Sequence, residues 1–285
     1  CRQRCFMLNT VYHDAIKKRE EARSIFKGEK FDQIIKTARE NWIEYTPQKK
    51  DAEIAGIDSS YNSTKFQGLE LWVVTGVSIK SDGKIITENH NQGLGQPTPE
   101  LETQASKMEV EACINSVDSA DLVILDGSLY SQFLTRQTSL GNSITSAIKK
   151  RNNVIFISKT SSARKQFEKF GSMAGDIFYY NRAVKTPCFS KIFVDTSLGP
   201  GKVVSYVYAR LRDSTPLIKI ELLGSNHMEN EIKSLLDIIT KNSVGGYPYS
   251  LKLAHENCKI SNSDLARLVS LYGLGNEIGS REVLS

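Results

Sequence analysis

The sequence predicts an α/β fold in which a mixed β-sheet is covered by helices. Three observations predict it: a long β-branched run at residues 69–80, two short apolar runs that each stop at an aspartate, and helical patterns between and after them. With 285 residues, the chain is long enough to bury a substantial hydrophobic core.

The N-terminal part is predicted to be helical. Residues 8–45 carry apolar positions at helical spacing among lysines and glutamates, which indicates a helix with a solvated charged face. The stretch TPQKKD (46–51) is rich in turn formers and is typical of a linker. We therefore divide the chain into a helical N-terminal region, 1–50, and a globular domain, 51–285.

The strands and helices of the domain follow from its local patterns. Apolar residues in AEIAGIDSSY (52–61) predict a strand that ends on Asp58, and SDG turns the long strand 69–80 back into KIITENH (84–90). The later elements are predicted as a helix at 100–119, a strand at 120–130 that stops at Asp126, a helix at 141–151, a strand at 152–160, a helix at 163–170, strands at 176–181, 191–196, 202–211 and 216–222, and helices at 227–241, 248–258 and 261–272. This order matches the ribonuclease H-like fold, with helical additions at both ends.

Composition excludes some classes of protein. The chain is 40% hydrophobic and carries a net charge of +5, which is compatible with a polyanionic partner. No apolar run approaches the roughly 18 residues of a membrane span, and the start lacks the apolar segment of a secretory signal. Five scattered cysteines cannot all pair, so we expect a reducing cytoplasm. The patterns G-x4-G-K-[ST], G-x-G-x-x-G and G-x-S-x-G are absent, so we expect no ATPase, dinucleotide or serine-hydrolase site.

The two strand-terminal aspartates are the main chemical signal. If the strands are neighbours, Asp58 and Asp126 meet at one edge of the sheet, where their charges repel unless cations lie between them. Carboxylate oxygens suit Mg²⁺ or Mn²⁺, and two such ions support phosphoryl transfer. The alternative is that each aspartate only caps the next backbone amides.

Two further segments extend this candidate site. In the helix at 100–119, Glu109 and Glu111 flank the apolar stripe on opposite sides, and Glu109 lies nearer its centre; either one can instead be an exposed helical glutamate. In GGYPYSLKLAHENCKIS (245–261), Tyr247 and His255 are eight residues apart and face the same side of a helix. His255 suits a late metal ligand or a proton donor, or else a surface or packing role.

These motifs resemble those of a known family. GIDSSY (56–61), ILDGSLY (124–130), SKTS (158–161) and GYPYSLKLAHENCKIS (246–261) are similar to the motifs of the NurA family of archaeal DNA-end nucleases, and the resemblance runs from about residue 50 to the C-terminus. It implies that Asp58, Asp126 and Glu109 bind metal, with Glu111 in reserve for Glu109, and that Tyr247 and His255 complete the site. Lys159 is a candidate phosphate contact or a plain surface lysine.

The resemblance also implies an activity and partners. It implies a nuclease that uses Mn²⁺, or Mg²⁺ in its place, degrades single- and double-stranded DNA from 5′ to 3′, and cuts single strands internally. It further implies a homodimer that works with the hexameric ATPase HerA in resecting double-strand breaks. Two alternatives stay open: an RNA nuclease or resolvase on the same fold, and a non-catalytic binding protein. The three acids together argue against the second.

Overall fold

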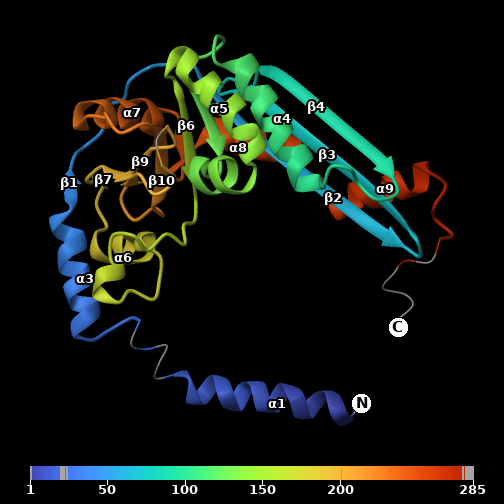
Figure 1. Ribbon diagram of the computed structural model, residues 1–285, viewed down its shortest axis with the longest axis horizontal. Helices are drawn as coiled ribbons and strands as arrows, with labels where there is room; N and C mark the ends of the chain where they lie inside the picture. The colour runs from blue at the N-terminus through green and yellow to red at the C-terminus, as the bar shows by residue number, and fades with distance from the viewer. Residues whose placement is uncertain (1, 20–22, 24, 200, 278, 280–285) are drawn as a thin grey trace.

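A single twisted sheet forms the centre of the molecule. The computed structural model describes residues 2–19, 23, 25–199, 201–277 and 279 (Figure 1). Within these residues, ten strands form one sheet in the order β1-β7-β9-β10-β6-β5-β2-β3-β4, with β8 paired to β9. The strands are β1 (Trp42–Glu44), β2 (Ile54–Phe66), β3 (Leu69–Lys80), β4 (Ile85–Leu94), β5 (Leu122–Asp126), β6 (Val154–Ser158), β7 (Cys188–Ser190), β8 (Phe193–Asp195), β9 (Val204–Arg210) and β10 (Ile218–Leu223).

The direction of the strands confirms the mixed sheet expected from the sequence. β2, β3 and β4 form an antiparallel meander, whereas β5 and β6 run parallel to β2. β10 and β9 then extend the sheet antiparallel on the far side of β6. The order β4-β3-β2-β5-β6 is the ribonuclease H-like arrangement, because the meander is followed by crossover connections through helices.

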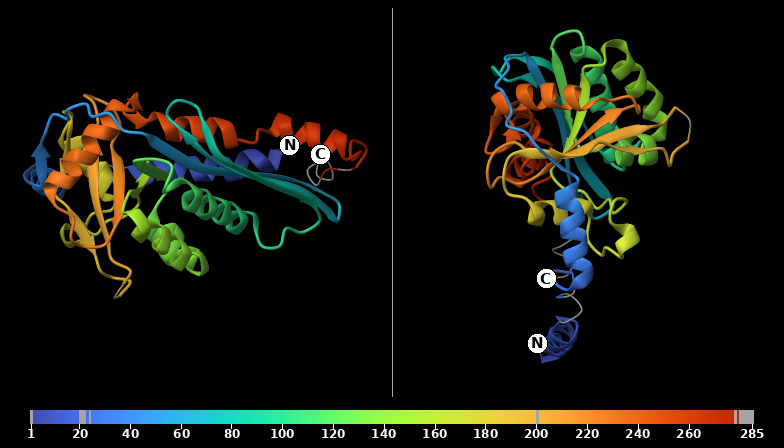
Figure 2. Two further views of the ribbon diagram at one scale, coloured as in Figure 1. Left: turned by 90° about the horizontal axis from the view of Figure 1, so that it is seen from above. Right: turned by 90° about the vertical axis from the view of Figure 1, so that its left-hand side faces the viewer.

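Helices cover both faces of this sheet. α4 (Leu101–Ser116) and α5 (Thr138–Arg151) lie on one face, and α7 (Glu229–Lys241) and α8 (Tyr249–Cys258) lie on the other (Figures 1 and 2). The remaining elements are α1 (Arg2–Lys17), α3 (Glu29–Glu40), α6 (Asp176–Ala183), α9 (Asn262–Leu271), a π-helix η1 (Leu129–Arg136), a 3-10 turn η2 (Glu168–Phe170) and a small hairpin, β11 (Ser243–Val244) with β12 (Tyr247–Pro248). No helix in the described part of the chain has the length and hydropathy to cross a membrane.

Burial on both faces explains the apolar runs of the central strands. Ile57 and Leu125 belong to a core cluster with α4 and α5, whereas Ile54 and Ile124 belong to a cluster with α7 and Leu251 of α8. Successive side chains of a strand point to opposite faces, so a strand covered on both faces must be apolar throughout. The same alternation determines the face of the sheet on which each polar side chain of the site lies.

Three local predictions were wrong. The region 8–45 is helical in α1, which ends at Lys17, and in α3, which begins at Glu29 after Gly28 (φ 110°), but the expectation was wrong at its end, because residues 42–44 form β1 and pair with β7. Residues 176–181 form α6 rather than a strand. Residues 163–170 form only the short η2 instead of a full helix.

The last two errors have a common physical reason. Aromatic residues favour strands, but Tyr179 and Tyr180 are consecutive and both buried against Phe167, which an alternating half-buried strand does not allow. The buried carboxylate of Asp176 accepts hydrogen bonds from the backbone amides of Gln166 (3.2 Å) and Phe167 (3.4 Å). Tertiary packing therefore sets the structure of both segments.

Candidate active site

The candidate site lies where two neighbouring strands stop pairing. β2 and β5 pair from Ile54↔Leu122 to Ile57↔Leu125, and β5 ends at Asp126. The prediction that the first strand ends on Asp58 was wrong, because β2 continues to Phe66 and Asp58 is paired with Val77 of β3. Beyond Ile57, no strand within the described residues pairs with β2 on its β5 side. Side chains from both faces of the sheet can therefore meet in this opening.

Asp58 lies on the α8 face of the sheet. Its Oδ2 is 2.9 Å from Nδ1 of His255, and its Oδ1 accepts a hydrogen bond from the amide of Ser59 (2.9 Å). Burial raises the pKa of Asp58, and the nearby Asp126 carboxylate raises it further, against the lowering effect of His255. His255 itself is half exposed, so its ring reaches from solvent to a buried carboxylate.

A glycine allows this contact between α8 and β2. A Cβ atom on Gly56 would lie 2.4 Å from the backbone carbon of Ser250 in α8. No side chain fits at that distance, so α8 packs directly on the strand backbone two residues before Asp58. This close approach brings His255, five residues later in α8, over Asp58.

Glu109 approaches from the opposite face. It is 5% exposed on α4, and its two oxygens accept hydrogen bonds from Ser59 Oγ (2.5 Å) and Gln132 Nε2 (2.6 Å). Burial is the largest cause that raises its pKa to about 8, and Asp58 and Asp126 contribute in the same direction. Glu111 is exposed and lies 3.9 Å from Lys107 on the outer side of the helix. Of the two glutamates, the structure brings Glu109 to the aspartates.

Asp126 completes the group at the end of β5. Its Oδ2 accepts a hydrogen bond from Lys159 Nζ (2.8 Å), and the same ammonium lies 4.6 Å from the ring centre of Tyr247. The Tyr247 hydroxyl is buried and makes no hydrogen bond within the described residues. Burial raises the pKa of Tyr247, and Asp126 adds to that effect. Asp126 and Lys159 border a cavity of about 480 Å³, which Ser59, Glu109 and Gln132 also line.

The family of the chain follows from its sequence. A family model for the NurA domain matches residues 52–260, which is well over half of the chain. The chain belongs to the NurA family. The resemblance inferred from the four motifs is thereby confirmed.

Known proteins agree with this assignment. NurA from Sulfurisphaera tokodaii, described as a DNA double-strand break repair nuclease, is 25% identical over 175 residues, which cover 54% of this chain. The match spans about half the length of that relative. The crystal structure of the NurA nuclease from Sulfolobus solfataricus has a TM-score of 0.77 at 19% identity and covers 93% of this chain and 96% of its own. A NurA structure bound to dAMP and manganese has a TM-score of 0.55 at 10% identity, with coverage of 96% and 97%. These structures share the fold.

The sequence did not reveal every residue of this NurA pocket. Ser59 and Gln132 hold the Glu109 carboxylate, yet only the position of Ser59, next to an aspartate, carried any signal. Gln132 lies in the π-helix η1, which no periodicity indicated. π-helical turns are rare and occur often at functional sites, because the extra residue redirects side chains.

The donor set fits a divalent cation. Asp58, Glu109 and Asp126 offer hard oxygen ligands, and the pKa values of the first two are raised mainly by burial and further by the neighbouring carboxylates, an effect that a bound cation would oppose. Among the described residues, no three acidic, histidine or cysteine side chains are already arranged as a metal cage. The carboxylates are instead held by Ser59, Gln132, His255 and Lys159, which would have to release or share them when a cation binds.

Proposed function

We propose that this chain is a metal-dependent deoxyribonuclease that hydrolyses phosphodiester bonds at the pocket of Asp58, Glu109 and Asp126. The observation that carries the proposal is the convergence of three carboxylates, from β2, α4 and β5, on one opening of the sheet. The similar proteins, a DNA double-strand break repair nuclease and a NurA nuclease, support DNA as the substrate.

We assign Asp58, Glu109 and Asp126 as the metal ligands, with His255 as a further ligand. Mn²⁺ is the expected ion, with Mg²⁺ as its substitute, and the crystal structure of a NurA protein bound to dAMP and manganese supports this choice. When bound at such a site, a divalent ion makes water a better nucleophile and offsets charge on the phosphate.

The other polar residues of the pocket have separate tasks in this proposal. His255 serves as a metal ligand or as the proton donor to the leaving oxygen, since its ring touches Asp58 and is open to solvent. Lys159 pairs with Asp126 and lies at the cavity wall, where it can neutralise a phosphate. Tyr247 lies against Lys159, and its ring helps to orient that ammonium beside Asp126.

The reaction that we propose follows the family. It is 5′ to 3′ degradation of single- and double-stranded DNA, with internal cutting of single strands, in the cytoplasmic resection of double-strand breaks. Residues 51–285 form the nuclease domain in this proposal, and residues 1–50 form the N-terminal region. An RNA nuclease or resolvase is the second candidate, because the carboxylates do not select the sugar.

We propose that the protein acts as a homodimer together with a HerA-type hexameric ATPase. α1 stands apart from the sheet and exposes an apolar face of Met7, Leu8, Val11 and Ile16, which a second copy would cover (Figures 1 and 2). Leu271, 82% exposed in α9, and Leu274 are the proposed contacts with the ATPase, whereas Ile278, the third residue expected there, lies outside the described residues. The sequence has no Walker A pattern, so ATP hydrolysis must come from the partner.

A cleavage assay tests the proposed activity. Asp58→Asn and Asp126→Asn should each abolish Mn²⁺-dependent cleavage of labelled DNA, because each removes a charged ligand and keeps the side-chain shape. Glu111→Gln is the matched control, since Glu111 is exposed on the same helix as Glu109 and should leave the rate unchanged. Both aspartate variants within about tenfold of the wild-type rate at saturating Mn²⁺ would refute the proposal. Parallel digestion of RNA separates the two candidate functions.

A second assay tests the assembly. Light scattering should show a dimer at micromolar concentration, and a HerA-type ring should co-elute with the wild-type protein. Leu271→Asp should weaken co-elution without changing cleavage of DNA, because Leu271 lies on α9, away from the carboxylates. A monomer that also fails to bind the ring would contradict both parts of the assembly proposal.

A further inference from the structure

A second groove adjoins the carboxylate pocket. It has a volume of about 690 Å³ and shares Ser128, Ser131, Ser158 and Thr160 with the pocket that contains Glu109 and Asp126. The two hollows therefore meet at these residues, beside the ends of β5 and β6. A linear ligand that enters one can extend into the other.

The lining of this groove includes many side chains that can donate hydrogen bonds. Hydroxyl groups come from the four shared residues and from Ser161 and Ser162, which continue the wall beyond β6. Three basic side chains, Arg164, Lys165 and Lys219, face one acid, Glu168. Hydroxyl and cationic donors of this kind contact phosphate and sugar oxygens in nucleic-acid complexes.

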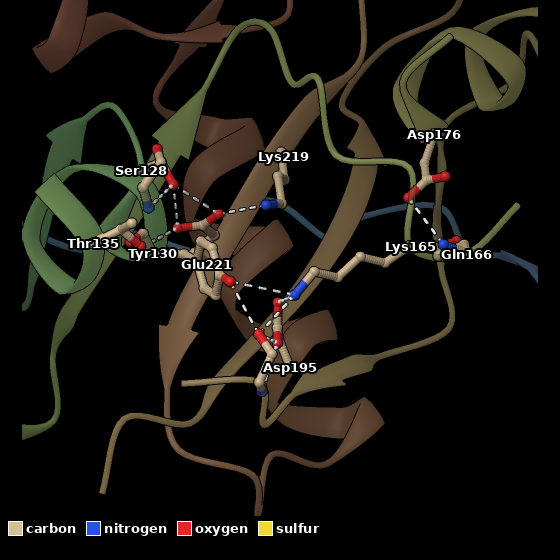
Figure 3. Close-up of polar contacts among 11 residues, drawn as sticks. Ser128, Tyr130, Thr135, Lys165, Gln166, Asp176, Asp195, Lys219 and Glu221 are labelled. Atoms are coloured by element: carbon tan, nitrogen blue, oxygen red, sulfur yellow. Dashed lines mark hydrogen bonds and ion pairs between the residues drawn. The ribbon is translucent and has the colours of Figure 1, made fainter. Parts of the chain in front are cut away.

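Two of the three cations are already paired and form the walls of the groove. Figure 3 shows Lys219 against the buried Glu221, whose carboxylate also accepts hydrogen bonds from Ser128 Oγ (3.0 Å) and the amide of Tyr130 (3.1 Å). It also shows Lys165 reaching Asp195 and the Tyr130 hydroxyl. These contacts hold in place the segment that follows Asp126, which contains Ser128 and Tyr130.

Arg164 is the cation that remains available. It is exposed in the wall of the groove, and none of the hydrogen bonds or ion pairs within the described residues involves its guanidinium. Its loop is nonetheless held in place, because Asp176 binds the amides of Gln166 and Phe167 and donates its own amide to the carbonyl of Ala163 (2.7 Å). A fixed loop with a free guanidinium presents a ready site for an anion at low entropic cost.

We propose that this groove binds the sugar-phosphate backbone of the substrate strand next to the cleaved bond, with Arg164 contacting a phosphate. The inference rests on the proposed nuclease function and adds a second point of contact to it. Arg164 positions the strand and takes no part in bond cleavage. The paired lysines form the wall of the groove rather than bind the strand, since their charges are already balanced by Glu221 and Asp195.

The test compares binding of single strands of two lengths. Affinity is measured by fluorescence anisotropy with a dinucleotide and with a twelve-nucleotide strand, without added metal so that cleavage does not interfere. Arg164→Ala should weaken binding of the long strand by about tenfold at low salt and lower the slope of log affinity against log salt by about 0.7. Binding of the dinucleotide should not change, and Arg164→Lys should restore part of the loss because it keeps the charge.

Lys149→Ala is the matched control. Lys149 is an exposed cation on α5 for which no hydrogen bond or ion pair exists within the described residues, and it does not line the groove. Equal effects of Arg164→Ala and Lys149→Ala on the long strand would overturn the inference.

These measurements distinguish failure of the groove inference from failure of the proposed nuclease function. If wild type binds and cleaves the long strand but Arg164→Ala does so equally well, the groove inference fails and the proposed function stands. If Arg164→Ala loses binding while wild type cleaves no DNA under any metal, the groove stands and the proposed activity fails.

Discussion

Replacing Glu109 with glutamine should stabilise the metal-free protein at neutral and alkaline pH and abolish its response to Mn²⁺. The carboxyl is buried beside Asp58 and Asp126, and its pKa is raised from an ordinary value of 4.5 to about 8. The folded state therefore keeps a proton that the unfolded chain releases. Stability from such a group is fully present below pH 4.5 and is lost as the pH rises to about 8. Glutamine is neutral at every pH, so it avoids this loss.

The size of the effect follows from the pKa. One pKa unit corresponds to about 1.4 kcal/mol, so Glu109 lowers the free energy of unfolding by about 5 kcal/mol between pH 4.5 and pH 8. Glutamine gives up part of the hydrogen bonding from Ser59 and Gln132, because its amide group donates where a carboxyl oxygen accepts, and this loss is worth about 1–2 kcal/mol. The net gain expected for Glu109→Gln at pH 8 is therefore about 3–4 kcal/mol, whereas near pH 4.5 only the hydrogen-bond loss remains and the variant should be less stable than wild type by about 1–2 kcal/mol.

Urea unfolding followed by circular dichroism measures this difference. Wild type, Glu109→Gln and the exposed control Glu111→Gln are unfolded in EDTA at several pH values between 4.5 and 8.5, and then with increasing Mn²⁺. Wild type should gain stability with Mn²⁺ by mass action, whereas Glu109→Gln should gain little. Parallel pH profiles for wild type and Glu109→Gln in EDTA would refute the assignment of a protonated Glu109. Equal stabilisation of both by Mn²⁺ would refute its role as a ligand.

Three other substitutions probe the site. His255→Ala should slow single-turnover cleavage by about tenfold or more, because acid–base or ligand assistance is lost; an unchanged rate would make His255 a surface residue. Tyr247→Phe should cost less activity and leave the fold intact, since its hydroxyl has no hydrogen-bond partner within the described residues; a loss as large as that of His255→Ala would contradict the orienting role. Gly56→Ala should lower the free energy of unfolding by about 1–3 kcal/mol and reduce cleavage, because its Cβ would meet the α8 backbone. Gly275→Ala, with open space around it, should show neither effect.

The sequence predicted the parts of this fold that depend on local pattern. The apolar runs of β5 and β6 are buried on both faces, and their composition indicated this correctly. The long strand and its turn into β4 also follow from β-branched residues and the sequence SDG. In α4 the apolar stripe indicated that Glu109, rather than Glu111, lies closer to the sheet, and the structure places it there.

Other features depend on packing that no local pattern contains. α6 is helical because Tyr179 and Tyr180 are both buried in an aromatic cluster with Phe167. Gln132 reaches Glu109 because η1 has an extra residue per turn, and Arg164 faces the groove because Asp176 holds its loop from ten or more residues away. Each of these depends on a partner that is distant in space or irregular in backbone, so periodicity carries no signal for it.

The candidate site originates in the unequal lengths of two adjacent strands. β5 stops at Asp126 while β2 runs on to Phe66, so the sheet opens on one side of Asp58. Alternation along β2 then sends Asp58 to the α8 face and Ser59 to the α4 face, where they meet His255 and Glu109 respectively. Carboxylates from opposite faces can approach one another only at such an opening, because a continuous sheet would separate them. The pairing register of β2 and β5 is therefore the structural feature that creates the site, and the groove beyond β6 extends from the same opening.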